Sequence, residues 1–592
     1  ELSVAYRTEP ETKRLLDLAK KLEGVARHAS VHAAGVVIAD KSLTEYTPLQ
    51  RETNGDKIIT QYDMYTVGED GVGLLKMDLL GLRNLTIIEE TLNFAKQNQN
   101  KEVDFSKLPL DDKKTYDLLS SGETTGIFQL ESPGMRRYIK ELKPTSIFDL
   151  QAMVALYRPG PMANIPEFIS RKHNSKLISY PDPRLKDILK QSYGVLTYQD
   201  DVLLSAIALA GYSWLDADKL RKAVGKKIPS EMRKQEELFV AGCVTNGMKR
   251  NRAREFFNLI TPFAGYGFNK AHAACYATIA FRTAYLKANF PVEFMTALLT
   301  AESRGTSGPT HNEKIAQAIA ECRRIKVTIL PPSVNHSLSD FSIENREKIR
   351  FGLSAIKNVG TAAISSIIEA RGSGSFISLS DFCQRIDSQK VNKKTVESLI
   401  KAGAMDEFGK RAALLSIYQD VVEKIAKEQK QQSKNQFGLF DHEPKPSISQ
   451  HERSFSSDIE EFSENEKLLF EKELLGFFLT DHPLNQQLDN LVKRTTHAIP
   501  SLSEEKEGSK IKVGGVLSTV KKILTRKTNS EMAFITLEDN VGYSIECVVF
   551  PKVFDALRYN LVKDSIVVIE GILNFKDDEP VIIVNNLEKL AA

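Results

Sequence analysis

The chain has 592 residues, of which 42% are hydrophobic and 27% are charged, a composition typical of a globular protein with several domains. Its 80 basic and 77 acidic residues leave a net charge of +3, which neither requires nor excludes a nucleic-acid partner. Five cysteines, none at metal-ligand spacing, argue against structural zinc and a disulfide framework and indicate a reducing cytoplasm.

The sequence also argues against a membrane span and a signal peptide. No apolar run approaches the roughly 20 residues that a membrane span needs, so we expect no membrane partner. The opening ELSVAYRTEP has neither the basic region nor the apolar core of a signal peptide. It also lacks an initiator Met, from which we expect that the chain begins inside a longer protein.

The first elements mix helices and strands. Residues 8–24 have helical spacing and end on Gly24, which predicts a helix. Residues 32–40 and 71–80 predict strands, and helical periodicity resumes at 84–97. Two strands flanked by helices indicate a sheet with one helical layer.

Most of the remaining chain is helical, up to a strand-rich end. Residues 111–426 predict a large helical domain with long loops, which include LYRPGPM and FAGYGFNKAH. Near its end, FGLSAIKNVGTAAISSIIEARGSGSF predicts two short helices around a tight turn. Residues 426–465 are rich in Gln, Ser, Lys and Glu and predict a linker. Five strand candidates within 510–590 predict a small barrel such as an OB-fold.

Asp78 stands out because it interrupts a leucine-rich run, GLLKMDLLGLRN, that predicts a buried strand. An ionised carboxylate is costly in an apolar setting unless a cation or hydrogen-bond donors compensate it. One interpretation is a Mg²⁺ ligand, with Lys76 on the same face of the strand to neutralise phosphate charge. The other is a cap of the helix entered near Gly81, or a partner of a buried Arg. The residues alone favour this second, structural interpretation.

Basic residues gather at three further places. DKLRKAVGKK places Arg221, Lys222, Lys226 and Lys227 close together, either as a phosphate site or as a solvated helix face. FAGYGFNKAHAACYA combines glycines, aromatic residues, an Asn, a Lys and a His, which suits close approach to a nucleotide or simple packing. In ALYRPGPM, Arg158 precedes a rigid turn that fixes its guanidinium.

Two shorter motifs complete the set. AIKNVG is typical of a helix-hairpin-helix turn that offers backbone N–H groups to a phosphate, although an ordinary turn between helices fits equally well. Asn358 stands where that motif usually has Gly, and Asn tolerates positive φ. In the linker, QFGLF has the form of a docking peptide, in which Leu439 and Phe440 fill a pocket and the Gln436 amide sets the register; the alternative is chance.

Together these stretches closely resemble the α subunits of bacterial DNA polymerase III, the C-family replicative polymerases. The similarity runs almost end to end through KLEGVARHASVHAAGVVIA, LLKMDLLGLRNLTII, TTGIFQLESPGM, ALYRPGP, YGVLTYQDDV, LRKAVGKK, FAGYGFNKAHAACYA, EFMTALLTAE, ILPPSVNHS and LGFFLTDHPL. The fold that this implies is α+β and multidomain. It has a partial mixed-sheet palm, large and mostly α-helical fingers with a helix-hairpin-helix, and a C-terminal OB-fold β-barrel.

The resemblance implies template-directed nucleotidyl transfer, in which a primer 3′-hydroxyl attacks the α-phosphate of a dNTP with two Mg²⁺ ions. Three palm aspartates hold the metals in that family, and the one in its K-x-D strand falls on Asp78. Asp78 is then a catalytic metal ligand and Lys76 a catalytic cation beside it. The implied nucleotide-binding residues are Arg158, Arg221, Lys222, Lys226, Lys227, Asn269, Lys270 and His272. The implied DNA-binding residues are Lys357, Asn358 and Gly360, and the implied clamp-binding residues are Gln436, Leu439 and Phe440.

The resemblance also implies a division into parts and a set of partners. The parts are 1–25, the end of the thumb; 26–85, a partial palm; 86–345, fingers; 346–425, the helix-hairpin-helix region; 426–465, the linker; 466–509, a helical connector; and 510–592, the OB-fold. The partners are primer–template DNA, dNTPs and the sliding clamp. A proofreading exonuclease and a clamp loader are expected to bind through further segments.

Three alternatives to a replicative polymerase are left open. Residues 1–77 contain no match to the family's D-x-D aspartate pair, so we expect that the chain alone does not polymerise. One alternative is therefore a catalytically incomplete module that binds DNA and clamp. Another is the error-prone branch of the family, against which QFGLF argues because that branch generally lacks the clamp peptide. A repair nuclease or helicase is remoter, because no Walker A pattern is present.

Overall fold

The computed structural model describes residues 2–25, 29–53, 55–68, 71–226, 229–266, 268–305, 309–433, 459–476, 479, 491, 494–525, 530–539, 543–563, 565–576 and 579–590. The chain divides into two compact units, Glu1–Arg83 and Asn84–Ala592, which we describe separately. Within the described ranges, no helix combines the length and the apolar character that crossing a membrane requires.

The first unit is small and carries little core. Its helices are α1 (Leu2–Thr8), α2 (Pro10–Leu22) and α3 (Met64–Val67), and its strands are β1 (Gly35–Ile38), β2 (Leu49–Arg51), β3 (Ile58–Thr60) and β4 (Leu75–Asp78). The strands form two antiparallel pairs, β1 with β4 and β2 with β3. The predicted helix at 8–24 and both predicted strands are therefore present, and β2 and β3 were not anticipated.

The expectation that the run around Asp78 forms a buried strand is wrong. Leu75 is 60% exposed, and Leu79 and Leu80 just beyond the strand are 64% and 75% exposed. Among the described residues of this unit, only Thr47, Val67 and Leu74 are buried, so β4 lacks a core to pack against. The leucines gave the appearance of burial because hydrophobicity was the only evidence in the sequence.

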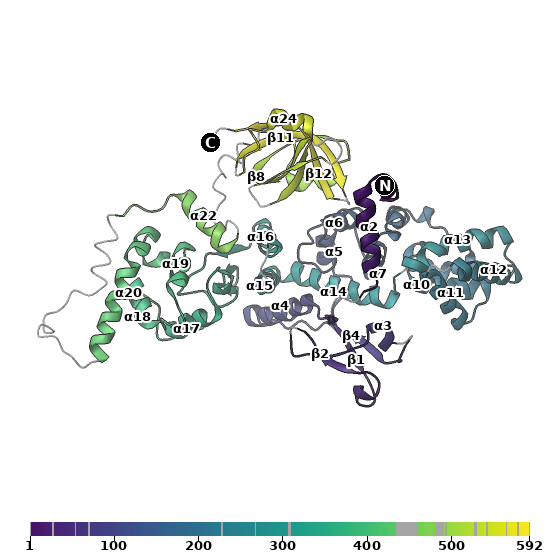
Figure 1. The fold of residues 1–592 in the computed structure, drawn as a ribbon, viewed down its shortest axis with the longest axis horizontal. Helices are drawn as coiled ribbons and strands as arrows, with labels where there is room; N and C mark the ends of the chain where they lie inside the picture. The colour runs from purple at the N-terminus through teal and green to yellow at the C-terminus, as the bar shows by residue number, and fades with distance from the viewer. Residues whose placement is uncertain are drawn as a thin grey trace, which may run out of the picture. The chain divides into compact units, whose positions relative to one another are not determined.

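The second unit begins with a series of helices that share three cores (Figure 1). The helices are α4 (Arg83–Gln99), α5 (Lys113–Ser120), α6 (Pro133–Leu142), α7 (Ile147–Leu156), α8 (Ile165–His173), α9 (Lys186–Leu189), α10 (Gln199–Ala210), α11 (Trp214–Lys226), α12 (Pro229–Thr245), α13 (Arg250–Tyr266), α14 (Lys270–Asn289), α15 (Pro291–Ser303) and α16 (Pro309–Arg324). Helices α5–α8 pack with α14 around Phe168 and Phe281, and α10–α13 pack around Phe239.

Part of the long loop predicted at FAGYGFNKAH is helical. Helix α13 continues to Tyr266 and α14 begins at Lys270, so the break between them is short. The glycines in this motif suggested an open loop, but the adjoining helices override that local preference. The consequence is that Asn269 and Lys270 lie at the start of a long helix.

A mixed sheet and a compact helical domain follow. The strands β5 (Thr328–Leu330), β6 (Ser342–Glu344) and β7 (Lys348–Arg350) form a three-stranded sheet with both parallel and antiparallel pairs, which the sequence analysis missed. The helices that follow are α17 (Thr361–Arg371), α18 (Leu379–Arg385), α19 (Lys393–Lys401), α20 (Arg411–Ser433) and α22 (Glu464–Leu475). The first of the two short helices predicted around KNVG is a single 3₁₀ turn, Leu353–Ala355.

The C-terminal part is a closed five-stranded barrel, as expected for an OB-fold. Its strands are β8 (Lys510–Leu524), β9 (Glu531–Glu538), β10 (Ser544–Val549), β11 (Ile566–Lys576) and β12 (Glu579–Lys589), and α24 (Pro551–Leu557) joins β10 to β11. Every predicted strand is present. The parallel pairing of β10 with β12 closes the barrel (Figure 1). Its core includes Val513, Leu537 and Ile569.

Candidate functional site

Asp78 ends strand β4 and shares a face of that strand with Lys76. The Lys76 ammonium donates a 2.6 Å hydrogen bond to Asp78 Oδ1, and Nδ1 of His32 lies 3.8 Å from the same oxygen. The hydrogen bond from Lys76 is the main reason that the pKa of Asp78 lies below its ordinary value, and His32 adds to the effect. The carboxylate is therefore ionised and half exposed, available to a cation.

These residues supply one metal ligand rather than a complete metal site. No group of three His, Cys, Asp or Glu side chains with metal-binding geometry occurs among the residues that the structure describes. A Mg²⁺ ion takes six oxygen ligands and usually keeps several waters, so one carboxylate with a free oxygen fits as a partial contribution. The exposed position of Asp78 allows such sharing.

Arg158 follows helix α7, where the chain turns sharply at Gly160 with a φ of +102°. Its guanidinium lies over the ring of Phe268, 3.6 Å from the ring centroid. Partial burial lowers the pKa of Arg158 from its usual range, although an arginine remains charged at any physiological pH. A cation held against an aromatic face in this way is fixed in direction and retains its N–H donors for an anion.

Helix α14 begins beside Phe268. The Asn269 side chain caps the helix by accepting a 2.9 Å hydrogen bond from the His272 N–H. The Lys270 ammonium lies 5.4 Å from the centroid of the Tyr198 ring, and the His272 ring contacts both Phe268 and Tyr276. The structure thus brings Arg158, Asn269, Lys270 and His272 together at one helix N-terminus, which carries a partial positive charge.

The two basic groups of this cluster lack acidic partners. Within the described part of the chain, neither Arg158 nor Lys270 forms an ion pair with a carboxylate. The Gln151 side chain donates to the Lys270 carbonyl at 3.4 Å, which leaves the ammonium unaffected. Lys270 does interact electrostatically with the buried Asp201, but a cation outside an ion pair still attracts an anion such as a polyphosphate.

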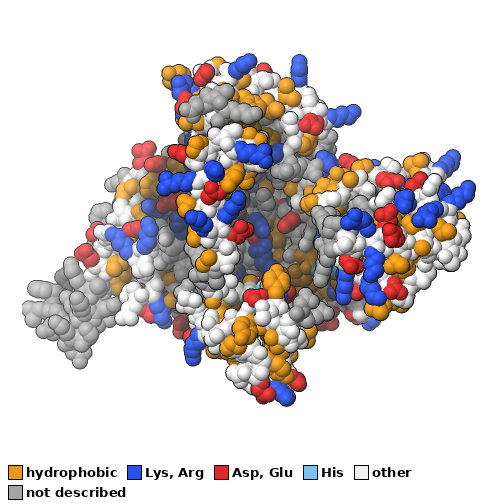
Figure 2. All heavy atoms as spheres, turned by 45° about the vertical axis from the view of Figure 1, so that its right-hand side comes forward, with side chains coloured by type: hydrophobic (Ala, Val, Ile, Leu, Met, Phe, Trp, Pro, Cys, Tyr) orange, Lys and Arg blue, Asp and Glu red, His pale blue; other side chains and the backbone are white. Residues whose placement is uncertain are grey.

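The basic motif on α11 differs in this respect. Arg221 and Lys222 both pair with Asp218, at 2.7 Å and 3.4 Å. Figure 2 shows basic and acidic side chains interspersed over the α10–α13 lobe, which is typical of a solvated surface. Lys226 is the last residue of α11, its side chain lies outside the description, and Lys227 lies outside the described residues.

The KNVG turn links the single 3₁₀ turn Leu353–Ala355 to helix α17. Asn358 adopts a left-handed conformation with a φ of +67°, the conformation that the turn was expected to require of it. Its side chain donates to Ser398 Oγ at 3.1 Å, and its carbonyl accepts a 3.0 Å bond from the Thr395 hydroxyl. Gly360 caps helix α17 without a side chain, so the first N–H groups of that helix keep no side-chain acceptor.

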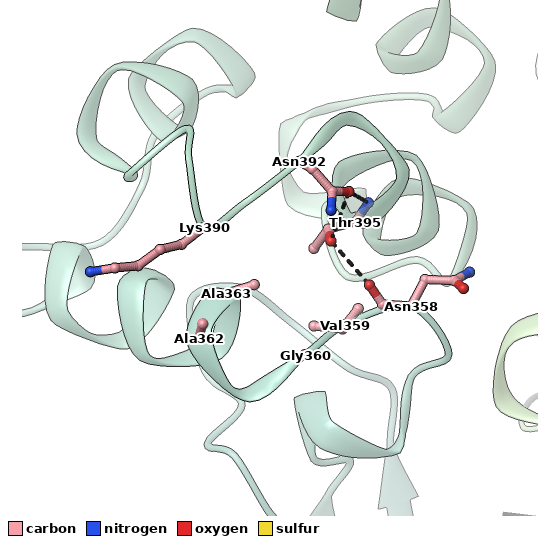
Figure 3. Close-up of a pocket in the computed structure, with 8 residues that line it drawn as sticks. All are labelled: Asn358, Val359, Gly360, Ala362, Ala363, Lys390, Asn392 and Thr395. Carbon is pink, nitrogen blue, oxygen red and sulfur yellow. Dashed lines mark hydrogen bonds between the residues drawn. The ribbon is translucent and has the colours of Figure 1, made fainter.

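A pocket of about 420 Å³ opens beside this turn, where α17 and α19 both begin (Figure 3). Asn392 caps α19 by accepting from the Thr395 N–H at 3.0 Å. Lys357, Asn358 and Gly360 are all exposed, as a surface that contacts a nucleic-acid backbone requires. The pocket is lined by Asn358, Val359, Gly360, Ala362, Ala363, Lys390, Asn392 and Thr395.

Some predicted site residues are not described by the structure, and some residues at the site were not predicted. The predicted clamp-binding residues Gln436, Leu439 and Phe440 lie outside the described residues. Conversely, sequence reasoning missed Phe268, which supports Arg158, and Asp200, which accepts a 2.9 Å hydrogen bond from the Lys270 N–H. The signal for Asp200 was the acidic pair of TYQDDV in the first turn of a helix, but no local rule connects that pair to a residue 70 positions later.

Four regions of the chain match known protein families. Residues 1–81 match the family described as bacterial DNA polymerase III alpha NTPase domain, and residues 84–247 match the bacterial DNA polymerase III alpha subunit finger domain. Residues 326–414 match a helix-hairpin-helix motif, and residues 511–590 match an OB-fold nucleic acid binding domain.

Curated relatives agree with these matches. The chain is 40% identical over 573 residues to DNA polymerase III subunit alpha of Thermus aquaticus, an alignment that covers 95% of the chain and 45% of the relative. It is 41% identical over 585 residues to the Bacillus subtilis subunit and 38% over 594 residues to the Escherichia coli K12 subunit, covering 98% of the chain and 50% of each relative. The chain thus spans about half the length of these relatives, and it belongs to the family of bacterial DNA polymerase III α subunits.

Proposed function

We propose that this chain is part of a replicative DNA polymerase and that it binds the incoming dNTP with the fingers residues at the start of α14. The observation that carries the proposal is the meeting of Arg158 and Lys270 at the α14 N-terminus, where neither cation forms an ion pair among the described residues. A triphosphate carries several negative charges and matches such a site. The reaction is attack of a primer 3′-hydroxyl on the α-phosphate, with pyrophosphate as leaving group.

The eight fingers residues then have different roles. Arg158 and Lys270 hold phosphate oxygens, Asn269 fixes the first turn of α14, and His272 faces solvent beside them. Arg221 and Lys222 contribute less because Asp218 already pairs with them. Lys226 and Lys227 retain the roles that the family resemblance implies.

Asp78 and Lys76 belong to the palm in this proposal. Asp78 would be one oxygen ligand of a Mg²⁺ ion, and Lys76 would hold the carboxylate in place while offsetting phosphate charge. When bound, such an ion polarises the phosphoryl oxygen and stabilises the attacking and leaving oxygens. The further ligands would come from other family segments.

The remaining parts would hold nucleic acid and partners. The helix-hairpin-helix would bind the duplex backbone through Lys357, Gly360 and the N-terminus of α17, and the barrel would lie on single-stranded template. QFGLF would bind the sliding clamp. The division into thumb, palm, fingers, linker and barrel with the boundaries given above is part of the same proposal.

A second candidate is a module that binds nucleotide and DNA without chemistry. The specific observation in its favour is that the described residues contain no complete metal site. Binding of dNTP and DNA is common to both candidates, whereas primer extension by a polypeptide that supplies the remaining family segments is expected only for the polymerase.

The nucleotide site is tested by dNTP affinity in the presence of primer–template DNA, measured by fluorescence anisotropy of a labelled nucleotide. Lys270→Ala and Arg158→Ala are each expected to weaken binding by about tenfold, as loss of a charge-assisted hydrogen bond predicts. Arg221→Ala is expected to have a smaller effect. Lys113→Ala, which removes an exposed lysine paired with Asp117 on α5, is the matched control. Equal affinities for Lys270→Ala and the control would remove the basis of the proposal.

A further inference from the structure

The short segment Thr197–Asp201 is bonded to the residues that begin α14, although 70 residues separate them in sequence. The Gln199 N–H donates a 3.0 Å hydrogen bond to the Phe268 carbonyl, and Tyr198 and Phe268 form an isolated parallel β-bridge. The Asp200 carboxylate accepts a 2.9 Å bond from the Lys270 N–H. The start of α14 is therefore held on both sides of Asn269.

The segment itself is firmly anchored. Asp201 is buried, with 1% of its surface exposed, and its carboxylate accepts 2.9 Å hydrogen bonds from the N–H groups of Thr197 and Tyr198. These bonds fix the turn that leads into α10. A bond from Asp200 on this anchored turn consequently restricts the first residue of α14.

The Asp200 carboxylate bonds to the backbone and not to either cation nearby. Its oxygen is engaged by a backbone N–H, and it forms an ion pair with neither the Lys270 ammonium nor the Arg158 guanidinium. Phe268, which lies under Arg158, is held by the adjacent bond from Gln199. Both cations thus depend on the same segment for their position.

We propose that Asp200 is a positioning residue for the triphosphate site, which sets the first turn of α14, and with it Lys270, through its hydrogen bond to the Lys270 N–H. This inference rests on the proposed nucleotide-binding function and deepens it. Asp200 touches no substrate in this account. Its role requires a hydrogen-bond acceptor and does not require a negative charge.

The test compares Asp200→Ala, Asp200→Asn and Asp112→Ala in the full chain with primer–template DNA. Asp112 is the matched control because its carboxylate likewise accepts a backbone N–H, that of Thr115, at the start of another helix of the same unit, α5. The first measurement is the affinity for a fluorescent dNTP. The second is backbone hydrogen exchange in the first turn of α14 without nucleotide.

Asp200→Ala is expected to weaken dNTP binding by about tenfold and to speed exchange at 270–273, as loss of a hydrogen bond to a backbone N–H predicts. Asp200→Asn, which keeps an acceptor oxygen, is expected to stay within about twofold of the wild type in both measurements. Asp112→Ala is expected to leave both unchanged. Circular dichroism of each variant confirms that the fold is retained, and Asp200→Asn supplies a second variant if Asp200→Ala does not fold.

Three results would overturn the inference alone. The first is wild-type affinity in Asp200→Ala, and the second is an equal loss in Asp200→Asn, which would assign the effect to charge. Tighter binding in both Asp200 variants would also overturn it, because the carboxylate would then compete with the phosphates. A wild-type chain that binds no dNTP, while exchange in α14 still responds to Asp200→Ala, would overturn the proposed function and the positioning role with it.

Discussion

Asp78 is held ionised at an exposed strand end by a lysine two residues earlier. The leucines around it had suggested burial, and burial would have made the charge costly. Because the end of the strand is exposed, the Asp78 carboxylate stays hydrated, and no metal is needed to explain why a charged residue stands in this run. What supports a catalytic role is the combination of an accessible carboxylate, a neighbouring cation and the family to which the chain belongs.

This account predicts the effect of Asp78→Asn in a polypeptide that contains this chain and the remaining family segments. Primer extension is expected to fall by about a hundredfold or more because a metal ligand is lost, while DNA affinity is retained. The control is Asp56→Asn, which removes another exposed carboxylate of the same unit. Steady-state extension rates that match those of the control would rule out the metal assignment.

Asn358 offers a second test at the level of one residue. Asn358→Ala is expected to lower the free energy of unfolding by about 1 kcal/mol, because Ala resists the left-handed conformation more than Asn or Gly. Asn358→Gly is expected to lie between the Ala variant and the wild type, since Gly adopts positive φ freely but loses the hydrogen bond to Ser398 Oγ. Chemical denaturation measures both, and duplex affinity is expected to follow the same order. A more stable Ala variant than Gly variant would show that this turn is not the constraint.

At the scale of elements, the N-terminus of α10 carries a pH-dependent cap. Burial is the main reason that the pKa of Asp201 rises to about 6 from 3.8, although its two backbone hydrogen bonds and Lys270 act in the opposite direction. Between these pH values the folded state binds the proton more tightly than the unfolded state does. The contribution of Asp201 to stability is therefore largest at low pH and is lost as the pH rises from about 4 to about 6.

Asp201→Asn is expected to remove this dependence. The Asn oxygen still accepts a backbone N–H, and no proton is exchanged. The free energy of unfolding of the variant, relative to that of the wild type, is therefore expected to increase across this pH range. Denaturant titrations at pH 4.5 and pH 7 measure the difference. If the two proteins differ by the same amount at both pH values, the raised pKa of Asp201 is refuted.

The elements also show what a sequence can predict. The five barrel strands were predictable because their β-branched residues alternate and are bounded by polar or Gly residues. This pattern fits the two-residue repeat of a strand and not the repeat of a helix. Five other strands have only three residues each, which is too short for an alternating pattern to be recognised in the sequence. They are β2, β3, β5, β6 and β7. The break before α14 was misjudged because its glycines favour loops locally, while packing of the long helices decides the outcome.

The candidate site was predictable only in part. Arg158 and Lys270 could be named because each stands in a distinctive motif, but their meeting at one helix end depends on the packing of α7 against α14. The pairing of Arg221 with Asp218 was readable from their spacing on α11, and it argues for a lesser role. Phe268 and Asp200 could not be selected, because their importance lies in contacts between distant segments.

At the scale of the whole molecule, the candidate site residues fall in two units of different character. The first unit carries Asp78 and buries few side chains, whereas the second places Arg158 just after α7 and Lys270 at the start of α14, two helices with extensive cores. In the proposed function, this rigid support for Arg158 and Lys270 would fit the precision that phosphoryl transfer requires. The helix-hairpin-helix and the barrel belong to the same second unit.

The most direct measurement of the central claim is chemical labelling of the phosphate site. A deoxynucleoside polyphosphate with a terminal pyridoxal group forms an imine with a nearby lysine, which borohydride reduction makes permanent for peptide mapping by mass spectrometry. With primer–template DNA present, the account predicts that the label falls on Lys270 and that excess unlabelled dNTP prevents it. Labelling confined to lysines outside the start of α14, or labelling of Lys270 that dNTP does not reduce, would contradict it.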